Sequence, residues 1–469
     1  RRGLENMSQT INFSPVTRLS GLLSVEVVID DGWIKEANAK GTMFRGYEKI
    51  MQGRKVTDAV YLTQRVCGIC SLAHGAVGSY LLDELYGSTL SQRAQYLRNI
   101  MLVADFLQNH IRHFYFFSLP DFVEFPNRPP WQNQNLVDGR LKPKDNQRLV
   151  GHYFDAVKAA QEAHEILALF GGKAPHQHSF VQGGVAVAPT ADKINRAQAL
   201  LANILQFIRE KLIPDTELLA QVYNDYFKIG VTPKRLISCG LFKFGEQNQD
   251  DFWPRGVING RQFVQPDVDK IEETVANSWF EEEDGQLEPA PDKPGAYSWT
   301  KSVQYDGEFF ETGPLARAII RGDYPLQTST MDRIVARSRE TLQIAELMQK
   351  WLAELEPGPP PISQSEKPVK TKVTATTDAM RGALLHQAEI EEEEVSSYQI
   401  ITPTVWNFSP KDKLGRRGPV ENALVGTKIP NANLLTTILG RIIRSFDPCI
   451  SCATHVLNVE GKIEEKVTF

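Results

Sequence analysis

The sequence predicts a mostly α-helical protein with small β-sheets, which is an α+β class. Apolar residues recur at helical spacing over several long stretches, and one clear β-hairpin lies near the N-terminus. Two Cys-x-x-Cys pairs lie far apart, with Cys67 and Cys70 near the start and Cys449 and Cys452 near the end. One such pair holds a metal from one side, and a second pair can complete its coordination sphere. The fold is therefore expected to bring the two pairs together.

The first half of the chain is predicted to be dominated by helices. A β-hairpin is expected over residues 22–36, where β-branched residues flank an Asp-Asp-Gly turn. Long helices are expected over residues 91–114 and 145–170, the second ended by a Gly-Gly pair. A third is expected from 191, capped by Thr190, towards 212, with Pro214 interrupting the helix before the pattern resumes at 217–227.

The second half mixes irregular structure, helices and strands. Residues 248–313 are rich in turn signals, and their acidic run 281–285 is predicted to be a solvated loop. The best internal boundary is the proline segment 357–361, although the separated cysteine pairs argue that 1–469 is a single unit. Further helices are expected at 329–355 and 433–444, and strands at 369–376 and 394–402.

Composition narrows the possible partners. With 469 residues, 42% hydrophobic and 23% charged, the chain is expected to be globular with a sizeable core. The formal charge of -5 without a long basic run gives no reason to expect nucleic acid as a partner. No apolar run approaches the 18 residues or more of a membrane span, and no export signal is visible, so export would need another chain.

The cysteine pairs allow two readings from their spacing. The first is a structural zinc site with four cysteine ligands. The second is a reactive centre, because zinc knuckles are short while residues 71–448 separate these pairs, and thiolates also suit nickel and iron. Titratable or charged groups crowd both pairs, which favours the reactive centre: Arg65, His74, Asp447 and His455. The fifth cysteine, Cys239, is expected to be a buried small apolar residue.

The two cysteine motifs and further segments resemble the large, catalytic subunit of nickel-iron hydrogenases, in particular the membrane-bound uptake type. The resemblance covers nearly the whole chain in the order of the family, and it implies the multi-helix large-subunit fold with a central bundle of long helices. The segments that carry it are Ser14-Pro15-Val16-Thr17-Arg18, Met43-Phe44-Arg45-Gly46-Tyr47-Glu48, Arg65-x-Cys67-Gly68-x-Cys70 with His74, His110-x-x-His113-Phe114-Tyr115, Gly171-Gly172-Lys173-x-Pro175-His176, Arg381-Gly382-Ala383-Leu384, Trp406-Asn407-x-Ser409-Pro410 and Ser445-Phe446-Asp447-Pro448-Cys449-x-x-Cys452-x-x-His455.

The resemblance also implies a ligand set and a reaction, the heterolytic cleavage of H2. Cys67 and Cys449 would be terminal thiolates on nickel, and Cys70 and Cys452 would bridge nickel to an iron that carries carbon monoxide and cyanide. A terminal thiolate, Cys449, would accept the proton. The remaining implied residues are Glu48 and His455 at a magnesium site, Asp121, Asp447 and Pro410 around the centre, and His74, His110 and His113 as either donors or satisfied core histidines. His152 and His164 are expected to have no chemical role.

Three residues in two segments depart from the pattern of the family. Ser20 and Leu22 stand in Arg18-Leu19-Ser20-Gly21-Leu22 where many members have a glutamate that takes the first proton step and a histidine. A serine hydroxyl can pass a proton but cannot store one near neutral pH. Lys411 stands where many members have an arginine over the open metal position. Lysine keeps the positive charge but lacks the planar guanidinium group, and it could act as a base towards H2.

Two further hypotheses concern the N-terminal and C-terminal ends of the chain. Residues 1–6 precede Met7 and are interpreted as an addition before the natural start. Residues 456–469 resemble the extension that the family removes after the histidine, here His455. With this tail attached, either His455 is displaced from the magnesium site or the tail leaves through a surface channel, with Lys462–Phe469 as a short strand.

The partners and the location follow from the same resemblance. Because no cysteines remain for iron–sulfur clusters, the electrons are expected to pass to a small subunit that carries such clusters, and from there to a membrane cytochrome or another acceptor. The complex is expected to be membrane-associated and to face outward or into the periplasm, exported with the small subunit, with a cytoplasmic location as the alternative. The alternative function is an H2-sensing or non-catalytic subunit, which Ser20 and Lys411 motivate.

Overall fold

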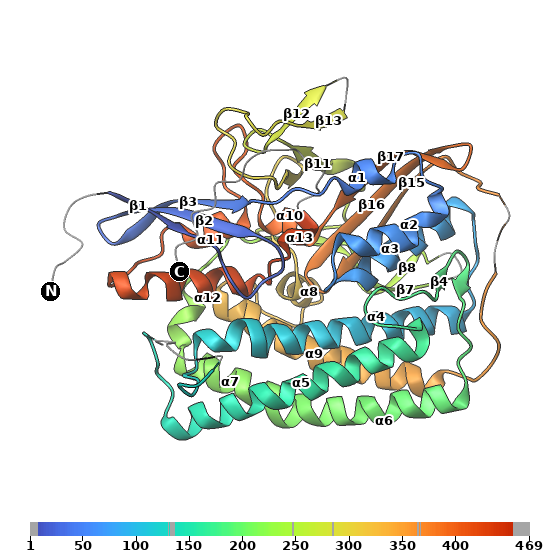
Figure 1. The fold of residues 1–469 in the computed structure, drawn as a ribbon, viewed down its shortest axis with the longest axis horizontal. Coiled ribbons are helices and arrows are strands. Elements are labelled where there is room, and N and C mark those ends of the chain that lie inside the picture. Colours follow the sequence, from blue (N-terminus) through green and yellow to red (C-terminus); the bar gives the residue numbers. More distant parts are fainter. Residues whose placement is uncertain are drawn as a thin grey trace.

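The structure is a computed structural model that describes residues 8–129, 131, 137–245, 248–283, 286–363, 365 and 367–453. A layer of long helices lies on one side of the molecule, and small sheets and short helices lie on the other (Figure 1). Mixed helices and small sheets confirm the predicted α+β class. The predictions for residues 1–6, His455 and the 456–469 tail lie outside the described residues.

The helix layer contains four long helices that run side by side (Figure 1). Ser91 caps α4 by accepting a hydrogen bond from the Ala94 amide, and nearly every residue of α4 is buried. A capping box of Ser329 and Asp332 begins α9. The four helices are α4 (Gln92–Arg112), α5 (Pro143–Gly171), α6 (Ala191–Phe207) and α9 (Thr330–Glu354).

The predicted interruption at Pro214 is wrong. The chain stays helical from α6 through a π-helical turn, Ile208–Leu212, into α7 (Ile213–Val222). Pro214 occupies the first turn of α7. The wider turn before it accommodates the missing amide and the proline ring, so the helix continues.

The N-terminal sheet confirms the predicted hairpin and adds a strand. β2 (Leu23–Asp30) pairs antiparallel with β3 (Trp33–Gly41), and β1 (Gln9–Phe13) pairs with the other edge of β2. Asp31 and Gly32 both have positive φ, as a type I′ hairpin turn requires. The sheet packs its apolar face on the C-terminal part of the chain.

A second sheet combines the two predicted C-terminal strands with a strand that the sequence analysis missed. β15 (Lys372–Ala379) and β17 (Glu394–Ile401) flank β16 (Gly382–Glu391). Helix α3 (Ser71–Leu85) packs against β15 and β16 and was also missed. Both elements are buried nearly all round, so they lack the one-sided periodicity that marks amphipathic elements.

Residues 248–313 form short strands and turns, as predicted. The acidic residues 281–283 are exposed, but they belong to the hairpin of β12 and β13 rather than to a loop. The short strands outside the two larger sheets are β4 (Phe180–Val181), β5 (Gly184–Val185), β6 (Arg235–Ser238), β7 (Leu241–Phe244), β8 (Asp250–Trp253), β9 (Gly256–Asn259), β10 (Gln262–Val264), β11 (Ile271–Thr274), β12 (Phe280–Glu283), β13 (Gln286–Pro289) and β14 (Ser302–Tyr305).

The remaining helices are short. The predicted final helix is confirmed as α12, and α13 follows it with the second cysteine pair. These helices are α1 (Tyr47–Met51), α2 (Ala59–Leu62), α8 (Pro314–Ile320), α10 (Pro403–Asn407), α11 (Pro419–Leu424), α12 (Leu435–Ser445) and α13 (Ile450–Ala453).

Candidate metal centre

The four cysteines come together at the junction of two short segments, as predicted. Cys67 follows a 3-10 turn, and Cys70 precedes the first residue of α3. Cys449 and Cys452 lie at the start and within α13, and Thr404 of α10 accepts a hydrogen bond of 3.0 Å from the Cys449 amide. Each pair is thus held by the first turn of a helix, which points its two thiols to the same side.

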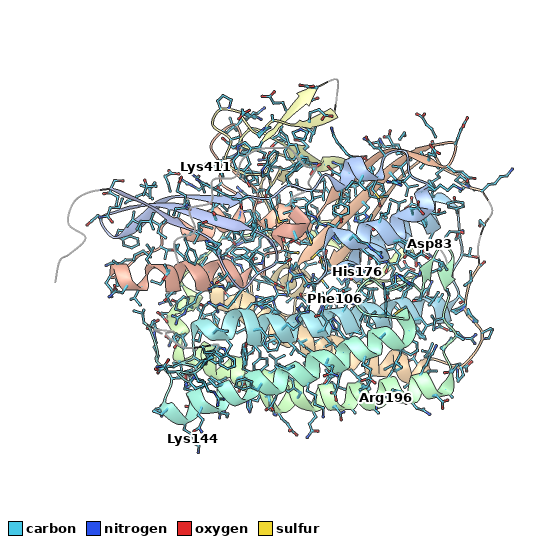
Figure 2. The ribbon with its side chains drawn as sticks, viewed as in Figure 1. Asp83, Phe106, Lys144, His176, Arg196 and Lys411 are labelled. Carbon is cyan, nitrogen blue, oxygen red and sulfur yellow. The ribbon has the colours of Figure 1, made fainter. Side chains whose placement is uncertain are left out.

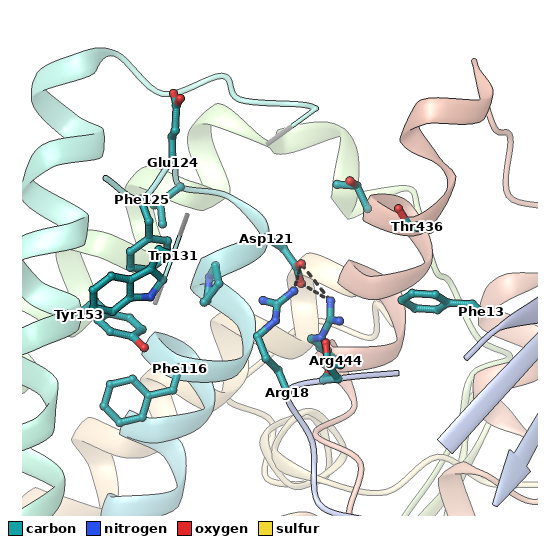
Figure 3. Close-up of a pocket in the computed structure, with 14 residues that line it drawn as sticks. Phe13, Arg18, Phe116, Asp121, Glu124, Phe125, Trp131, Tyr153, Thr436 and Arg444 are labelled. Carbon is teal, nitrogen blue, oxygen red and sulfur yellow. Dashed lines mark hydrogen bonds and ion pairs between the residues drawn. The ribbon is translucent and has the colours of Figure 1, made fainter. Parts of the chain in front are cut away.

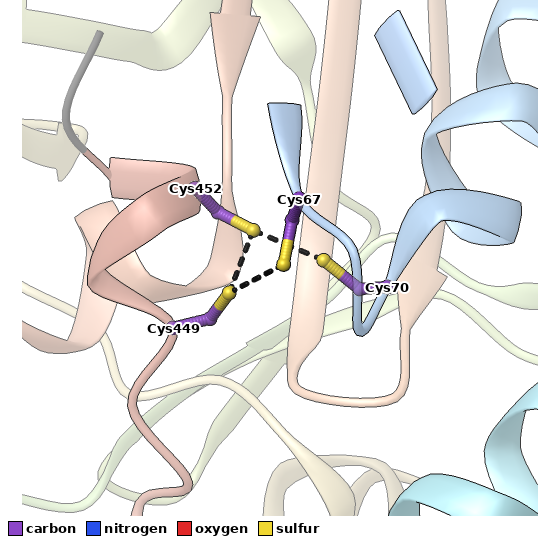
Figure 4. Close-up of side chains that lie close together, drawn as sticks. All are labelled: Cys67, Cys70, Cys449 and Cys452. Carbon is purple, nitrogen blue, oxygen red and sulfur yellow. Dashed lines mark hydrogen bonds between the residues drawn. The ribbon is translucent and has the colours of Figure 1, made fainter. Parts of the chain in front are cut away.

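The sulfur atoms form a tight cluster in which each motif contacts the other (Figure 4). The sulfurs of Cys67 and Cys449 are 3.1 Å apart, and those of Cys70 and Cys452 are 3.0 Å apart. All four lie within 4.8 Å of one another, and all are buried. A disulfide bond is about 2.05 Å long, so these thiols are free and together can bind metal.

The thiols do not share one ionisation behaviour. Burial raises the pKa of Cys67, but hydrogen bonds from the other three thiols and the charge of Arg381 lower it well below its ordinary value. The pKa of Cys70 is raised well above its ordinary value, first by its interaction with Cys449. Burial raises the pKa of Cys452 in the same direction. Four crowded thiols cannot all ionise in a buried site without a cation, and a bound metal supplies that charge.

A buried charge cluster supports the second cysteine motif, and we call it the Asp447 cluster. Arg381 donates to Asp447 Oδ1 at 3.0 Å, Arg337 lies 3.1 Å from Oδ2, and the Asn109 amide donates to Oδ2 at 2.9 Å. Burial raises the pKa of Asp447, but Arg381, His113 and Arg337 together hold it below its ordinary value. The cluster therefore carries an ionised aspartate and two guanidinium groups beside the sulfurs.

Ser20 lies at the centre, where the resemblance placed it. Its backbone pairs with the second cysteine motif, because the Ile450 amide donates to the Ser20 carbonyl at 2.7 Å. Its hydroxyl oxygen lies 3.9 Å from Cys67 Sγ and 3.2 Å from the Ser451 hydroxyl. Gly21 has a φ of +90°, and a Cβ there would approach the Ser451 amide nitrogen to 2.5 Å, so glycine is required for this contact.

Asp121 lies in a pocket of about 480 Å³ with aromatic walls (Figure 3). Its carboxylate forms ion pairs with Arg444 at 2.8 Å and with Arg18. Arg444 also donates to the Thr17 carbonyl at 3.0 Å, which ties this pocket to the segment before Ser20. In the described residues, Asp121 has no recorded contact with a cysteine.

Lys411 does not reach the cysteines in this conformation. Its ammonium donates to Glu36 of β3 at 2.7 Å, and Figure 2 shows Lys411 near that sheet. Arg417 also pairs with Glu36, at 2.8 Å. The neighbouring Pro410 carbonyl accepts a hydrogen bond from Ser302 at 2.7 Å. The role of Lys411 as a base therefore stays a prediction.

Glu48 belongs to a second, partly buried charge cluster, which we call the Glu48 cluster. The Lys301 ammonium lies between Glu48, at 2.9 Å, and Glu273, at 3.1 Å. The Ile400 amide also donates to Glu48, at 2.9 Å. Burial raises the pKa of Glu273, and one of its carboxylate oxygens is buried without a hydrogen-bond partner in the described part of the chain.

The histidines next to the predicted site form hydrogen bonds within the core. His74 Nδ1 lies 3.1 Å from His386 Nε2, His110 bonds to Glu340 at 2.9 Å, and His113 bonds to the Arg444 carbonyl at 2.6 Å. Burial lowers the pKa of His110 to about 4 and that of His113 to about 3. Both are buried and hydrogen-bonded within the core, which favours their interpretation as core histidines over donors to the centre. Cys239 is buried, as expected.

Sequence reasoning missed most of the residues that surround the sulfurs. Asn109 and Arg337 are buried polar residues in otherwise apolar helical patterns, and that was the available signal. Arg381 appeared only within a matched segment. Lys301 and Glu273 lie in the irregular region, where no periodicity marks a residue as buried, so nothing in the sequence connected them with Glu48.

Comparisons with known proteins agree with this geometry. The family model described as Nickel-dependent hydrogenase matches residues 45–129 and 125–455. The periplasmic [NiFeSe] hydrogenase large subunit of Desulfomicrobium baculatum is 33% identical, over 97% of both chains. The uptake hydrogenase large subunit of Bradyrhizobium diazoefficiens is 28% identical, over 99% of this chain and 98% of that protein. The solved Ni-Fe-Se hydrogenase of D. vulgaris Hildenborough aligns with a TM-score of 0.92 and 33% identity, over 96% of this chain and 100% of the other.

Proposed function

This chain belongs to the nickel-dependent hydrogenase family as a large, catalytic subunit, and from that premise we propose how its own residues serve the reaction. The enzyme is an oxidoreductase that cleaves H2 reversibly into protons and electrons. The observation that carries this function is the cluster of four buried cysteine sulfurs within 4.8 Å of one another. It offers soft thiolate donors from both ends of the chain.

The residues present fit a nickel–iron centre with anionic ligands. Three features support the fit: four free thiols, the positive Asp447 cluster beside them, and a guanidinium nitrogen of Arg381, Nη1, that is buried without a hydrogen-bond partner among the described residues. A buried N–H group without a partner costs free energy, and a cyanide on the iron would accept its hydrogen bond. Burial lowers the pKa of Arg381, whereas Asp447 and the thiols of Cys449, Cys70 and Cys67 raise it. Arg381 therefore lies close to these thiols.

The four cysteines would take the two roles that the family pattern implies. Cys67 and Cys449 would be terminal ligands of nickel, and Cys70 and Cys452 would bridge nickel and iron. The shortest sulfur contact, 2.8 Å, joins Cys449 to Cys452, and the other two join Cys67 to Cys449 and Cys70 to Cys452, so the four sulfurs form one continuous ligand set. The bound metals would supply the redox change and the polarisation of H2.

The side chains of the protein would orient the centre and manage the proton. A terminal thiolate, Cys449, would accept the proton from H2, and Asn109 and Arg381 would hold Asp447 in place behind it. Ser20, 3.9 Å from Cys67 Sγ, can pass a proton between waters but cannot store it. The Asp121 ion pairs with Arg18 and Arg444 would fix the segment that carries Ser20.

The Glu48 cluster fits a magnesium ion. Magnesium prefers oxygen ligands and keeps several of its waters, and the partnerless Glu273 oxygen can accept a hydrogen bond from such a water. Both carboxylates that meet the Lys301 ammonium, Glu48 and Glu273, offer oxygen donors of the kind that magnesium takes. His455 would be a further ligand, and its position lies outside the described residues.

A small subunit with iron–sulfur clusters would receive the electrons. Of the five cysteines, only Cys239 is outside the metal centre, and it is buried, so this chain offers no ligands for a cluster. Among the described residues, no helix is long and apolar enough to cross a membrane. We place the complex outward-facing or in the periplasm, exported with the small subunit and passing electrons to a membrane cytochrome, because one relative is named periplasmic and another an uptake hydrogenase.

Metal analysis and infrared spectroscopy test this assignment. The purified complex is expected to contain nickel and iron, to show infrared bands of bound carbon monoxide and cyanide, and to reduce a dye with H2. Stoichiometric zinc alone would overturn it. The alternative, an H2-sensing subunit, is favoured by Ser20 in place of an acid, and it would bind H2 at the same centre with dye reduction near background.

A further inference from the structure

Asp105 is a buried carboxyl group that has no role in the arrangement described so far. It lies on α4 and is 3% exposed. Its Oδ1 accepts a hydrogen bond of 3.0 Å from Gln108, whereas its Oδ2 is buried and has no hydrogen-bond partner among the described residues. A buried carboxylate oxygen without a partner is costly, so this group is stable when it carries a proton or meets a water.

Asp105 lies next to the metal centre. It precedes Asn109 by one helical turn, and residues four apart on a helix are about 6 Å apart on the same face. Asn109 bonds to both Asp447 and Arg381, and Arg381 presents its partnerless Nη1 in the same region. Two unsatisfied polar groups of opposite character, Asp105 Oδ2 and Arg381 Nη1, therefore lie beside the sulfurs.

A row of hydrogen-bonded polar side chains leads from Asp105 to the protein surface. The Gln108 side chain that donates to Asp105 accepts a hydrogen bond of 3.0 Å from Arg112. Arg112 is partly exposed at the end of α4, and its charge still interacts with Asp447 and Cys67. The spacing 105, 108 and 112 places the three side chains along one face of the helix. This row of side chains therefore begins near the metal centre and ends at the protein surface.

The acidity of Asp105 suits a group that both takes up and releases a proton. Burial raises its pKa to about 7, and the Cys67 thiol adds to this, while the hydrogen bond from Gln108 and the charges of Arg381 and Arg112 lower it. From the neighbouring helix α5, His164 faces Arg112, which contributes to the lowering of the histidine pKa. A carboxyl group of this pKa exchanges protons near neutral pH without a large free-energy cost in either direction.

We propose that Asp105 is a proton-relay residue of the hydrogenase reaction, which stores the proton that Ser20 cannot hold and releases it through water along the helix face of Gln108 and Arg112. The inference rests on the proposed function. After H2 cleavage, the S–H bond of the cysteine breaks, the proton reaches the Asp105 carboxylate through water, and an O–H bond forms. The sulfur returns to its thiolate form. Asp105 then loses the proton through water to solvent beside Arg112, while Gln108 and Arg112, which donate toward the carboxylate, keep it oriented. Each H2 supplies two protons, so this transfer occurs twice for each pair of electrons that leaves through the small subunit.

The direct test is Asp105→Asn in the complete complex with the small subunit. The variant keeps the shape of the side chain and can still accept from Gln108, but it cannot store a proton. H2-dependent dye reduction is expected to fall at least about tenfold, since general acid–base groups typically contribute 10²–10⁴-fold. Nickel content and melting temperature are expected to stay unchanged. Activity within twofold of the natural protein, with the same pH profile, would overturn the relay.

Asp215→Asn is the matched control. Asp215 on α7 is also buried, has one partnerless oxygen among the described residues, and has a pKa raised by burial. It bonds to Tyr115 and His152 and has no recorded contact with the cysteines. This variant is expected to keep dye reduction within twofold. An equal loss in both variants would show that any buried aspartate matters, and it would overturn the specific role of Asp105.

A spectroscopic readout does not depend on turnover. In infrared difference spectra taken as the pH rises through neutrality, a carboxylic acid band is expected to disappear with a midpoint near 7. Burial also raises the pKa of Glu421 to about 7, so part of this band is expected to come from Glu421. The band should lose intensity in Asp105→Asn and keep it in Asp215→Asn, and equal intensity in both variants would overturn the proposal. If Asp105→Asn fails to take up nickel, Asp105→Glu decides, with a shifted pH profile expected and an unchanged one contradicting the relay. Absence of nickel and iron from the natural protein would instead refute the proposed function.

Discussion

The two buried charge clusters beside the cysteines have opposite balances. In the Asp447 cluster, one carboxylate meets the two guanidinium groups of Arg381 and Arg337. In the Glu48 cluster, two carboxylates meet the single ammonium of Lys301. β17 leads from the second cluster to the sulfurs, because the Ile400 amide bonds to Glu48 and the Thr402 hydroxyl bonds to the Cys452 carbonyl.

The different ratio of carboxylates to cationic groups indicates which kind of ligand each cluster suits. Buried charges are stable only when they are paired, so an excess of one sign indicates a missing partner of the other sign. The positive excess of the Asp447 cluster matches thiolates and anionic iron ligands. The two carboxylates of the Glu48 cluster are oxygen donors that suit the divalent cation proposed there. The two sides of the centre are therefore complementary.

The largest effect is expected from Arg381→Met, which removes the positive excess. The variant leaves Asp447 and the thiolates without their main counter-charge, so the free energy of unfolding should fall by about 3–5 kcal/mol and nickel uptake should be lost. Chemical denaturation and elemental analysis measure both. Arg196→Met is the control, because its ion pair with Glu165 is exposed and worth at most about 1 kcal/mol. Full nickel loading in Arg381→Met would contradict the comparison.

Glu48→Gln should have the next largest effect, on the cation side. The substitution removes one of the two negative charges, so magnesium affinity and activity are expected to drop about 10–100-fold, with nickel retained. Added magnesium should restore part of the activity. Glu26→Gln removes the carboxylate that pairs with Lys40 on the N-terminal sheet and serves as control, with activity within twofold. Unchanged magnesium content in Glu48→Gln would show that this cluster binds no cation.

The two clusters should also respond to pH in opposite directions. The pKa of Asp447 is lowered in the folded state, so its stabilising contribution is present above the ordinary value of 3.8 and is lost as the pH falls. The pKa of Glu273 is raised above its ordinary value of 4.5, so its contribution is present at low pH and is lost as the pH rises through the folded value.

Chemical denaturation at a series of pH values checks these signs. Asp447→Asn should lose its destabilising effect as the pH falls below about 4. Glu273→Gln should become more stable than the natural protein as the pH rises above about 4.5. If the free energy of unfolding of both variants changes with pH in parallel with that of the natural protein, the two clusters do not differ in their response to pH.

The smallest effect is expected from Lys411→Met. Its ammonium pairs with Glu36, which is 44% exposed, so the loss should be at most about 1 kcal/mol of stability, with activity within twofold. Glu36→Gln removes this ion pair together with the one to Arg417, so it should lose at least as much stability. If Lys411→Met alone loses about 10²-fold in dye reduction, the lysine acts as a base at the centre, and the ion pair with Glu36 must open during turnover.

Long elements with clear signals at their ends were predictable, and two buried elements without such signals were not. The spacing of apolar residues located α4, α5, α9 and the β2–β3 hairpin, because each has local signals such as caps and a turn. The same approach missed α3 and β16, which are surrounded by protein on all sides. Their identity as helix and strand follows from long-range packing, to which a local pattern is blind.

The sequence alone determined the donor set of the centre. Two Cys-x-x-Cys pairs, with Ser20 in place of an acid, specify four thiolates and a weak proton site wherever the chain folds. Only the tertiary structure decided which charges surround them. It directed Lys411 to Glu36, enclosed Lys301 between two carboxylates, and left Asp105 and Arg381 each with a partnerless atom. Residue type is local, whereas burial and charge pairing arise from segments hundreds of positions apart, and these set the free energy of each buried charge.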